Sequence, residues 1–414
     1  MDFRLLGVTT VIQLLIQLLG LISGIIIIRL LPTKEYAWYT IANTMLGTMS
    51  VLSDAGISTA MMAHGGKVWT DRKALGVIFA TAYDLRKKFA LVSVVISLPT
   101  LYYLLHVQGA SLGIALLISV ALLPSVFASL SDNLLQIGPK LQKDILPLQR
   151  NTFFVSIYRT LVSLPVLFLL PFTWVALLSA GVIRTLGNYK LKKINSKWVD
   201  MRQHSDPQIA KSIMGQVRRL MPGALYYCFS GQIAVWLISI FGQHDSVASL
   251  GALARFSVLF AIVPVLFGTM ITPCFSKLAE QRHLMFNSFF RIQSLIALGA
   301  LIAVFFFYVF SDSFLWILGP SYSNLKFELV VSIISSLLGV AAGLSFSLFT
   351  SRGWSMHPVF SITVNLLSLI AGILIFDIET LRGVLMMNVF VNTIQYVLNG
   401  SFCWYKINSL KERS

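Results

Sequence analysis

Residues 8–30 read VTTVIQLLIQLLGLISGIIIIRL, and this stretch decides what kind of fold the chain can adopt. It carries no charge before Arg29 and is long enough to cross a bilayer as one helix, which takes about 20 residues. It is longer than the apolar core of a signal peptide and lacks a small-residue cleavage site, so we expect it to be retained as a span. Apolar segments of similar length recur along the whole chain, which predicts a polytopic α-helical membrane protein.

The composition agrees with this class. The chain has 414 residues, of which 56% are hydrophobic and only 12% are charged, and its mean hydropathy is +0.79. A soluble protein carries about twice that share of charge. The alternating strands of a membrane barrel are absent. The six histidines and three cysteines (Cys228, Cys274 and Cys403) occur singly, which predicts packing cysteines, no metal site and no cofactor.

Hydropathy with glycine, proline and polar breaks predicts twelve spans. Their limits are 8–30, 36–63, 89–106, 110–131, 153–170, 172–189, 219–242, 247–273, 291–310, 327–350, 356–376 and 381–404. With both termini in the cytoplasm, only Lys34, Lys326 and Arg382 fall in outside loops. Four arginines fall within spans, and every other basic residue, including Arg86, falls in a cytoplasmic segment. This asymmetry obeys the positive-inside rule, so the net charge of +16 reflects topology and predicts no nucleic-acid partner.

The longest connection between predicted spans is basic and divides the chain into equal sets of six. We therefore expect an N-terminal six-helix bundle at 1–189, a cytoplasmic linker at 190–218 and a C-terminal six-helix bundle at 219–414, around a central cavity. Because each half holds six spans, both halves begin on the same side of the membrane, which predicts a parallel internal repeat.

The four arginines within spans are Arg29, Arg159, Arg184 and Arg255. A guanidinium at the centre of a span costs roughly 2.5 to 3.5 kcal/mol on insertion scales, and arginine cannot shed its proton. Each must therefore reach the lipid headgroups or line a polar cavity. Arg29 and Arg184 lie near the ends of their spans, where snorkelling is plausible. Arg255 is the strongest cavity candidate, since Pro264 and Pro273 allow its span to bend.

Asp54 is the only acidic residue placed well inside a predicted span, so the interior carries net positive charge. This predicts an anionic ligand, and phosphate suits the guanidinium fork. Asp54 shares one helical face with polar and small residues every three or four positions. Two further single-face stripes occur, in spans 10 and 12. They are Ser332, Ser336, Gly339, Gly343 and Ser347, for which we expect helix packing, and Asn388, Asn392, Gln395 and Asn399, for which we expect a water-filled cavity suited to sugar hydroxyls.

Short motifs then resemble a known family. The runs RLLP at 29–32 and EY at 35–36, followed by DAGI at 54–57, are similar to the N-terminal signature of Wzx-type O-antigen and capsule polysaccharide flippases. These belong to the multidrug/oligosaccharidyl-lipid/polysaccharide exporter superfamily. The run GPSY at 319–322 is similar to that family's outer Gly-x-x-Tyr loop. The resemblance spans the whole chain, although Ala37 replaces the usual glycine and no strong motif precedes span 7.

The resemblance implies a transporter of the bacterial inner membrane, not an enzyme. Its substrate would be an undecaprenyl-diphosphate-linked oligosaccharide, moved from the cytoplasmic to the periplasmic leaflet by alternating access. Arg255, Arg159 and Arg29, with Arg184 as a further candidate, would hold the diphosphate, and Asp54 would serve ion coupling. The implied partners are the bilayer, the polysaccharide polymerase and the chain-length machinery. The chain has no GxxxxGK[ST] loop for nucleotide hydrolysis.

Three other functions stay open at this point. A cation or drug antiporter of the same superfamily would need several carboxylates in its cavity, where this chain offers Asp54. A membrane polymerase or ligase of lipid-linked sugars would need a large outer loop with catalytic charges, and the predicted outer loops are short. A channel or scaffold would give passive leak or no flux.

Overall fold

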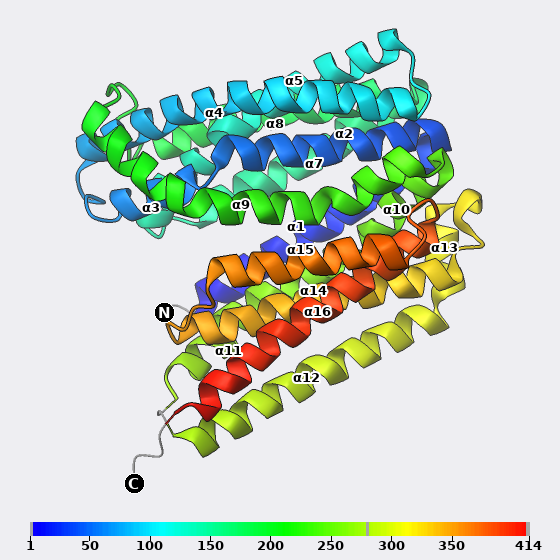
Figure 1. Ribbon diagram of the computed structural model, residues 1–414. Helices are drawn as coiled ribbons and strands as arrows, with labels where there is room; N and C mark the ends of the chain where they lie inside the picture. The colour runs from blue at the N-terminus through cyan, green and yellow to red at the C-terminus, as the bar shows by residue number, and fades with distance from the viewer. Residues whose placement is uncertain (1–2, 279–280, 411–414) are drawn as a thin grey trace. The chain divides into compact units, whose positions relative to one another are not determined.

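The computed structural model describes residues 3–278 and 281–410, and every regular element within them is a helix (Figure 1). The prediction of an all-α fold is therefore confirmed. The contacts divide the chain into two compact units, Met1–Ile240 and Phe241–Ser414.

The first unit is a bundle in which α5 packs on α8, α2 on α4, α7 on α8 and α1 on α7 (Figure 1). Its helices are α1 (Phe3–Leu30), α2 (Thr33–Asp54), α3 (Ile57–Gly65), α4 (Arg72–Val107), α5 (Leu112–Leu135), α6 (Ile137–Leu141), α7 (Leu146–Leu169), α8 (Thr173–Asn195) and α9 (Pro207–Phe241).

The second unit is built around α14, which packs on α16, α11, α12 and α10. Its helices are α10 (His244–Ser257), η1 (Val258–Ala261), α11 (Ile262–Ser276), α12 (Arg282–Val309), α13 (Ser311–Leu318), η2 (Pro320–Tyr322), α14 (Lys326–Ser351), α15 (Pro358–Ile375) and α16 (Leu381–Asn408).

Ten helices in the described ranges are long and apolar enough to cross a membrane, and they match ten of the twelve predicted spans. The other two predicted spans, 36–63 and 172–189, form helices that fall outside this group. The first is interrupted, because Ala55 (φ 43°) and Gly56 (φ 91°) adopt left-handed backbone between α2 and α3. The second, α8, carries Arg184 and a lysine cluster through its last turns. Both still pack inside the first bundle.

Some helices begin where a side chain accepts hydrogen bonds from the backbone N–H groups of the first turn, which have no partner within the helix. Asp71 accepts from the N–H groups of Lys73 and Ala74 and starts α4. Thr380 accepts from the N–H of Gly383 and starts α16. The α4 cap lies well before the predicted span limit of residue 89, so α4 is longer than the sequence analysis expects.

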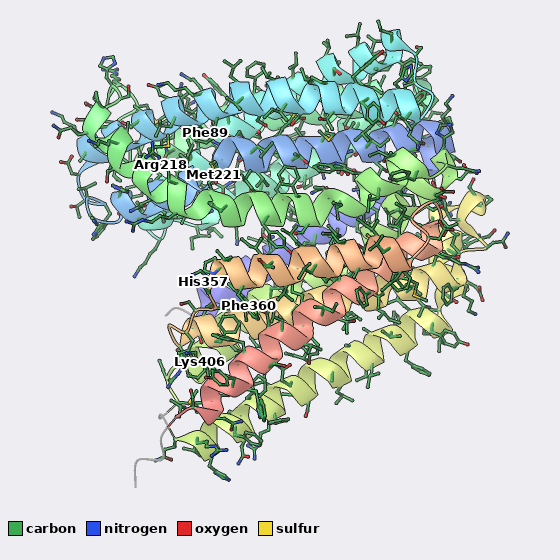
Figure 2. The ribbon with its side chains drawn as sticks, in the orientation of Figure 1. Phe89, Arg218, Met221, His357, Phe360 and Lys406 are labelled. Carbon is green, nitrogen blue, oxygen red and sulfur yellow. The ribbon has the colours of Figure 1, made fainter. Side chains whose placement is uncertain are left out.

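The core of the first unit also differs from the predicted domain limits. Val199 from the predicted linker, and Ile213 and Val217 from α9, belong to the same buried apolar cluster as Leu75 of α4. Phe89 of α4 and Met221 of α9 pack against this cluster (Figure 2). The chain divides between Ile240 and Phe241, not at 189–219, because α9 runs unbroken from Pro207 and its apolar face packs on α3 and α4.

The predicted linker is itself folded. The backbone N–H of Asp200 donates to the carbonyl oxygen of Arg72 at 3.0 Å. Hydrogen bonds from the Gln203 side chain and the Arg202 backbone hold the pKa of Asp200 below its usual value. A Cβ at Gly76 would lie 2.2 Å from the Asp200 carbonyl oxygen, so only glycine lets α4 approach this segment.

In the second unit, a separate core forms where α11, α12, α14 and α16 meet. It includes Phe275, Met285, Phe349 and Cys403. Lys406 of α16 (Figure 2) lies over the Phe402 ring at 5.7 Å from its centroid. Cys228 and Cys403 are buried, as expected for packing cysteines, whereas Cys274 is exposed. The outward face of α12 presents large apolar side chains, as a lipid-facing helix should.

Candidate functional site

A buried ion pair joins α2 and α4 in the first unit. The Arg86 Nη1 atom lies 3.5 Å from the Asp54 Oδ1 atom, and the Arg86 side chain is 0% exposed while that of Asp54 is 21% exposed. Asp54 is the last residue of α2, immediately before the left-handed Ala55–Gly56 break. The hydroxyl of Ser58, the second residue of α3, donates to the Asp54 carboxylate. The break thus turns the carboxylate toward α4.

Arg86 is unusual because its hydrogen-bonding capacity is unused. Among the residues that the structure describes, none offers a hydrogen-bond partner to the three guanidinium nitrogens of Arg86. A buried charge is expensive unless it is paired and hydrogen-bonded, and arginine stays charged. The Arg86 charge therefore depends on the carboxylates nearby.

A second ion pair lies close to the first. Arg184 of α8 donates from Nη2 and Nε to Asp132 Oδ2 of α5, at 2.7 and 3.2 Å. The Gln136 side chain donates to the other carboxylate oxygen at 3.3 Å. Both Asp132 and Arg184 act electrostatically on Arg86, so the four charges, contributed by α2, α4, α5 and α8, form one network. We call Asp54, Arg86, Asp132 and Arg184 the charge cluster.

The structure places Arg86 within a helix that the sequence analysis did not expect at that position. α4 begins at Arg72, and Arg86 lies on its buried face with Leu75, Phe79 and Ala82. The signal was present in the sequence: the Asp71 cap is followed by apolar residues at helical spacing of three and four. Asp132 also went unnoticed, since the predicted span ends one residue before it.

The other predicted arginines are distributed over three helices. Arg29 is exposed in the last turn of α1, Arg159 is half-buried in α7, and Arg255 is half-buried in the last turn of α10. Arg255 belongs to the second unit and the others to the first. The structure brings Arg184, but not Arg29, Arg159 or Arg255, into the charge cluster, and a shared diphosphate site for these arginines stays a prediction.

The amide stripe of α16 faces α14. The Asn392 amide nitrogen donates to the Ser335 carbonyl and hydroxyl oxygens, both at 3.0 Å, and the Asn399 amide nitrogen donates to the Ala342 carbonyl oxygen at 3.0 Å. Asn388 and Gln395 are half-buried. Two of the four amides thus hold helices together, and their predicted role in sugar binding stays untested.

Two serines of the small-residue stripe of α14 contact neighbouring helices, as expected for helix packing, whereas Gly343 is exposed and has no atom within 4 Å of its Cβ position. Ser336 lies 2.6 Å from the Ser257 hydroxyl and Ser347 lies 3.2 Å from the Thr272 hydroxyl. A further polar network escaped the sequence analysis, because its members are scattered along the chain. Tyr396 donates to Gln293 of α12 at 3.0 Å, and Gln293 donates to Ser345 of α14 at 3.0 Å.

Several motif residues that carry the family resemblance have structural roles. Glu35 accepts from the Thr173 backbone N–H at 2.7 Å, while its own carbonyl accepts from the Thr173 hydroxyl at 2.6 Å, so it fixes the start of α8. Tyr322 is buried, and Gly319 has φ 117°. Within the described ranges, no group of three or more histidine, cysteine, aspartate or glutamate residues is arranged to hold a metal ion.

The fold is similar to that of solved transporters. An inward-facing multidrug resistance MATE family transporter of the MOP superfamily aligns with 98% of this chain and 99% of its own, at a TM-score of 0.72 and 14% identity. A eukaryotic MATE transporter aligns with 98% of this chain and 96% of its own, at a TM-score of 0.64 and 14% identity. An outward-facing MATE family transporter aligns with 97% of this chain and 94% of its own, at a TM-score of 0.62 and 14% identity. No protein-family model and no curated protein matches the chain.

These similarities show that the chain has the MATE transporter fold, with two helical bundles, as the resemblance implied. The superfamily of these neighbours is the one that the sequence motifs resemble, while flippase membership within it stays a prediction.

Proposed function

We propose that this chain is a secondary transporter that moves a lipid-linked oligosaccharide across the bacterial inner membrane, with the diphosphate of the substrate held by interior arginines. Two observations support the proposal. The fold matches that of MATE transporters over nearly the whole chain. Among the charged residues singled out above, five arginines (Arg29, Arg86, Arg159, Arg184 and Arg255) outnumber two carboxylates (Asp54 and Asp132).

The charge balance is the observation that selects an anionic substrate. A positively charged, low-dielectric interior attracts phosphate oxygens and repels cations. The proposed substrate is an undecaprenyl-diphosphate-linked repeat unit, passing from the cytoplasmic to the periplasmic leaflet while its tail stays in lipid. The termini are then cytoplasmic, and the polysaccharide polymerase and chain-length machinery are the expected partners.

The charge cluster suggests how an ion gradient is coupled to transport. While Asp54 is ionised, it compensates the buried charge of Arg86. A proton or Na⁺ bound at Asp54 cancels that compensation, and the Arg86 guanidinium then requires another anionic partner or access to water. Cation binding at Asp54 thereby changes the affinity of the first bundle for an anionic group, and such a link between two binding events is what coupling to an ion gradient requires.

A cation or drug antiporter is the second candidate, because the similar structures include multidrug transporters. Asp54 and Asp132 are the residues that would serve it. Each already faces an arginine in the charge cluster, so a cationic drug would have to displace a guanidinium. The polymerase or ligase alternative loses support, since residues 311–325 between α12 and α14 fold into the short α13 and η2.

The test is transport by purified protein in sealed vesicles. We expect a fluorescent lipid-diphosphate oligosaccharide to reach the opposite leaflet with wild-type protein, and transport to be lost with Arg255→Ala while Arg255→Lys retains part of it. Equal reconstitution of the variants, measured by protein recovery, controls for folding. Normal transport by Arg255→Ala would remove Arg255 from the proposal, and proton-driven efflux of a cationic dye in place of lipid transport would favour the antiporter.

A further inference from the structure

A pocket of about 430 Å³ lies between the first turn of α7 and the last turns of α8, within the first unit. Its lining includes Arg150 of α7 and Lys190, Lys193 and Lys197 at the end of α8 and just beyond it. No acidic residue lines it. All four basic side chains are exposed, so the pocket is open to solvent or lipid headgroups and is strongly cationic.

The pocket is separate from the charge cluster, whose residues are not among its lining. Aromatic rings hold two of its cations in place. The Arg150 guanidinium lies 5.6 Å from the centroid of the Phe154 ring, and the Lys190 ammonium lies 5.7 Å from that of Tyr158. Pro147, Phe154 and Ile194 supply an apolar wall. The pocket therefore combines positive charge with apolar surface in one place.

The apolar surface continues from the pocket along both helices. Tyr158 and Leu161 on α7 are 51% and 64% exposed, and Leu186 on α8 is 64% exposed. A soluble phosphate would use only the cationic mouth, whereas a lipid would also cover this strip with its acyl chains. Basic pockets between membrane helices on the cytoplasmic side suit acidic headgroups, and the charge asymmetry of the sequence predicts that side for this end of α7 and α8.

We propose that this pocket binds the phosphate of an anionic membrane phospholipid, with Arg150, Lys193 and Lys197 on the headgroup and the acyl chains along the α7–α8 surface. Each basic residue near a membrane surface contributes about fivefold in affinity for acidic lipid. The lipid site is independent of the transported substrate. Failure of the lipid-binding test would therefore not argue against the proposed function, and loss of transport would not argue against the lipid site.

Native mass spectrometry of the full-length protein in detergent, titrated with phosphatidylglycerol, tests the proposal. We expect the triple variant Arg150→Gln/Lys193→Gln/Lys197→Gln to lose about a hundredfold in affinity for phosphatidylglycerol, because three fivefold losses multiply. The matched control is Lys67→Gln/Lys73→Gln/Lys88→Gln, which removes the same charge from exposed positions of the first unit outside the pocket and should bind as wild type does. The single variant Lys193→Gln, at an exposed position, should still show about a fivefold loss if the triple variant does not fold.

Three results would overturn the proposal. An equal loss of phosphatidylglycerol affinity in both triple variants would mean that the lipid is attracted by the net charge of the protein and not by this pocket. Equal binding of zwitterionic phosphatidylcholine would mean that the basic residues do not select the headgroup. Displacement of phosphatidylglycerol by inorganic phosphate at the same concentration would mean a site for a soluble anion, to which the apolar strip contributes nothing.

Discussion

Arg86 is the residue around which the charges of the first unit are arranged. It is fully buried and has no hydrogen-bond partner in the described part of the chain, with Asp54 beside it at 3.5 Å and the Asp132–Arg184 pair within electrostatic reach. A buried ion pair contributes little net stability, but removing one partner is costly, because the other charge is left buried and uncompensated. The two members of this pair should therefore behave differently when each is removed.

We expect Asp54→Asn to lower the free energy of unfolding by about 3–5 kcal/mol, since it strands the fully buried Arg86. Arg86→Met should cost less, because Asp54 is partly exposed and keeps its hydrogen bond from Ser58. The double variant Asp54→Asn/Arg86→Met should recover most of the loss. Unfolding in detergent by denaturant or heat, read as a double-mutant cycle, measures this. Additive effects of the two single changes would show that the pair is not energetically coupled.

The same double variant tests ion coupling through the Asp54–Arg86 pair. It removes the cation-binding carboxylate together with the guanidinium that it compensates, so the cost of a stranded charge does not obscure the transport measurement. We expect its substrate transport to lose dependence on the pH or Na⁺ gradient, while wild-type transport retains it. Gradient dependence that is unchanged in the double variant would exclude Asp54 from coupling.

At the scale of helices, glycines mark where backbones approach most closely. Gly383, in the first turn of α16, has no room for a side chain: a Cβ there would lie 1.7 Å from the Asp377 carbonyl oxygen. Gly400, later in the same helix, has no atom within 4 Å of the corresponding position. The two glycines thus form a matched pair for testing how α16 begins.

We predict that Gly383→Ala lowers stability by about 1–3 kcal/mol, the usual cost of overpacking, because a backbone atom cannot rotate away. Gly400→Ala should leave stability unchanged or slightly higher, since alanine favours the helix. Melting temperatures in detergent report both. A fall as large for Gly400→Ala as for Gly383→Ala would argue against close approach as the cause.

The helices also show what pattern alone can predict. Apolar runs located ten of the spans, because length and hydropathy are local properties. The break at Ala55–Gly56 was not predicted, since a left-handed alanine is set by its surroundings and not by propensity. The early start of α4 could have been predicted from the Asp71 cap. The predicted span nevertheless began at residue 89, because the first turns of α4 are rich in charged residues. The Arg86–Asp54 contact could not be predicted, because it depends on how α2 and α4 pack together, which a pattern within one segment does not specify.

At the scale of the whole chain, hydropathy and the family resemblance predicted an all-α membrane fold of two helical bundles, whereas the limits of its two units came from the structure. α9 belongs with the first unit because Ile213 and Val217 lie in that unit's core. Hydropathy did not predict this packing, because both residues lie in the basic, polar stretch 190–218. The sequence singled out the four arginines within spans because of their charge. Whether each of them is paired with a carboxylate depends on neighbouring helices. Arg184 has a carboxylate partner in Asp132 that the sequence analysis placed outside the spans.

The central claim is that this interior selects a negatively charged head group. Vesicles containing wild-type protein test it most directly by comparing three probes under the same ion gradient: a lipid-diphosphate oligosaccharide, an uncharged lipid-linked oligosaccharide of the same length, and a cationic dye. We predict transport of the diphosphate lipid, with the uncharged lipid at least tenfold slower, about 1.4 kcal/mol in the barrier, and no movement of the dye. Transport of the dye with neither lipid moved would contradict the claim and make this chain a cation antiporter.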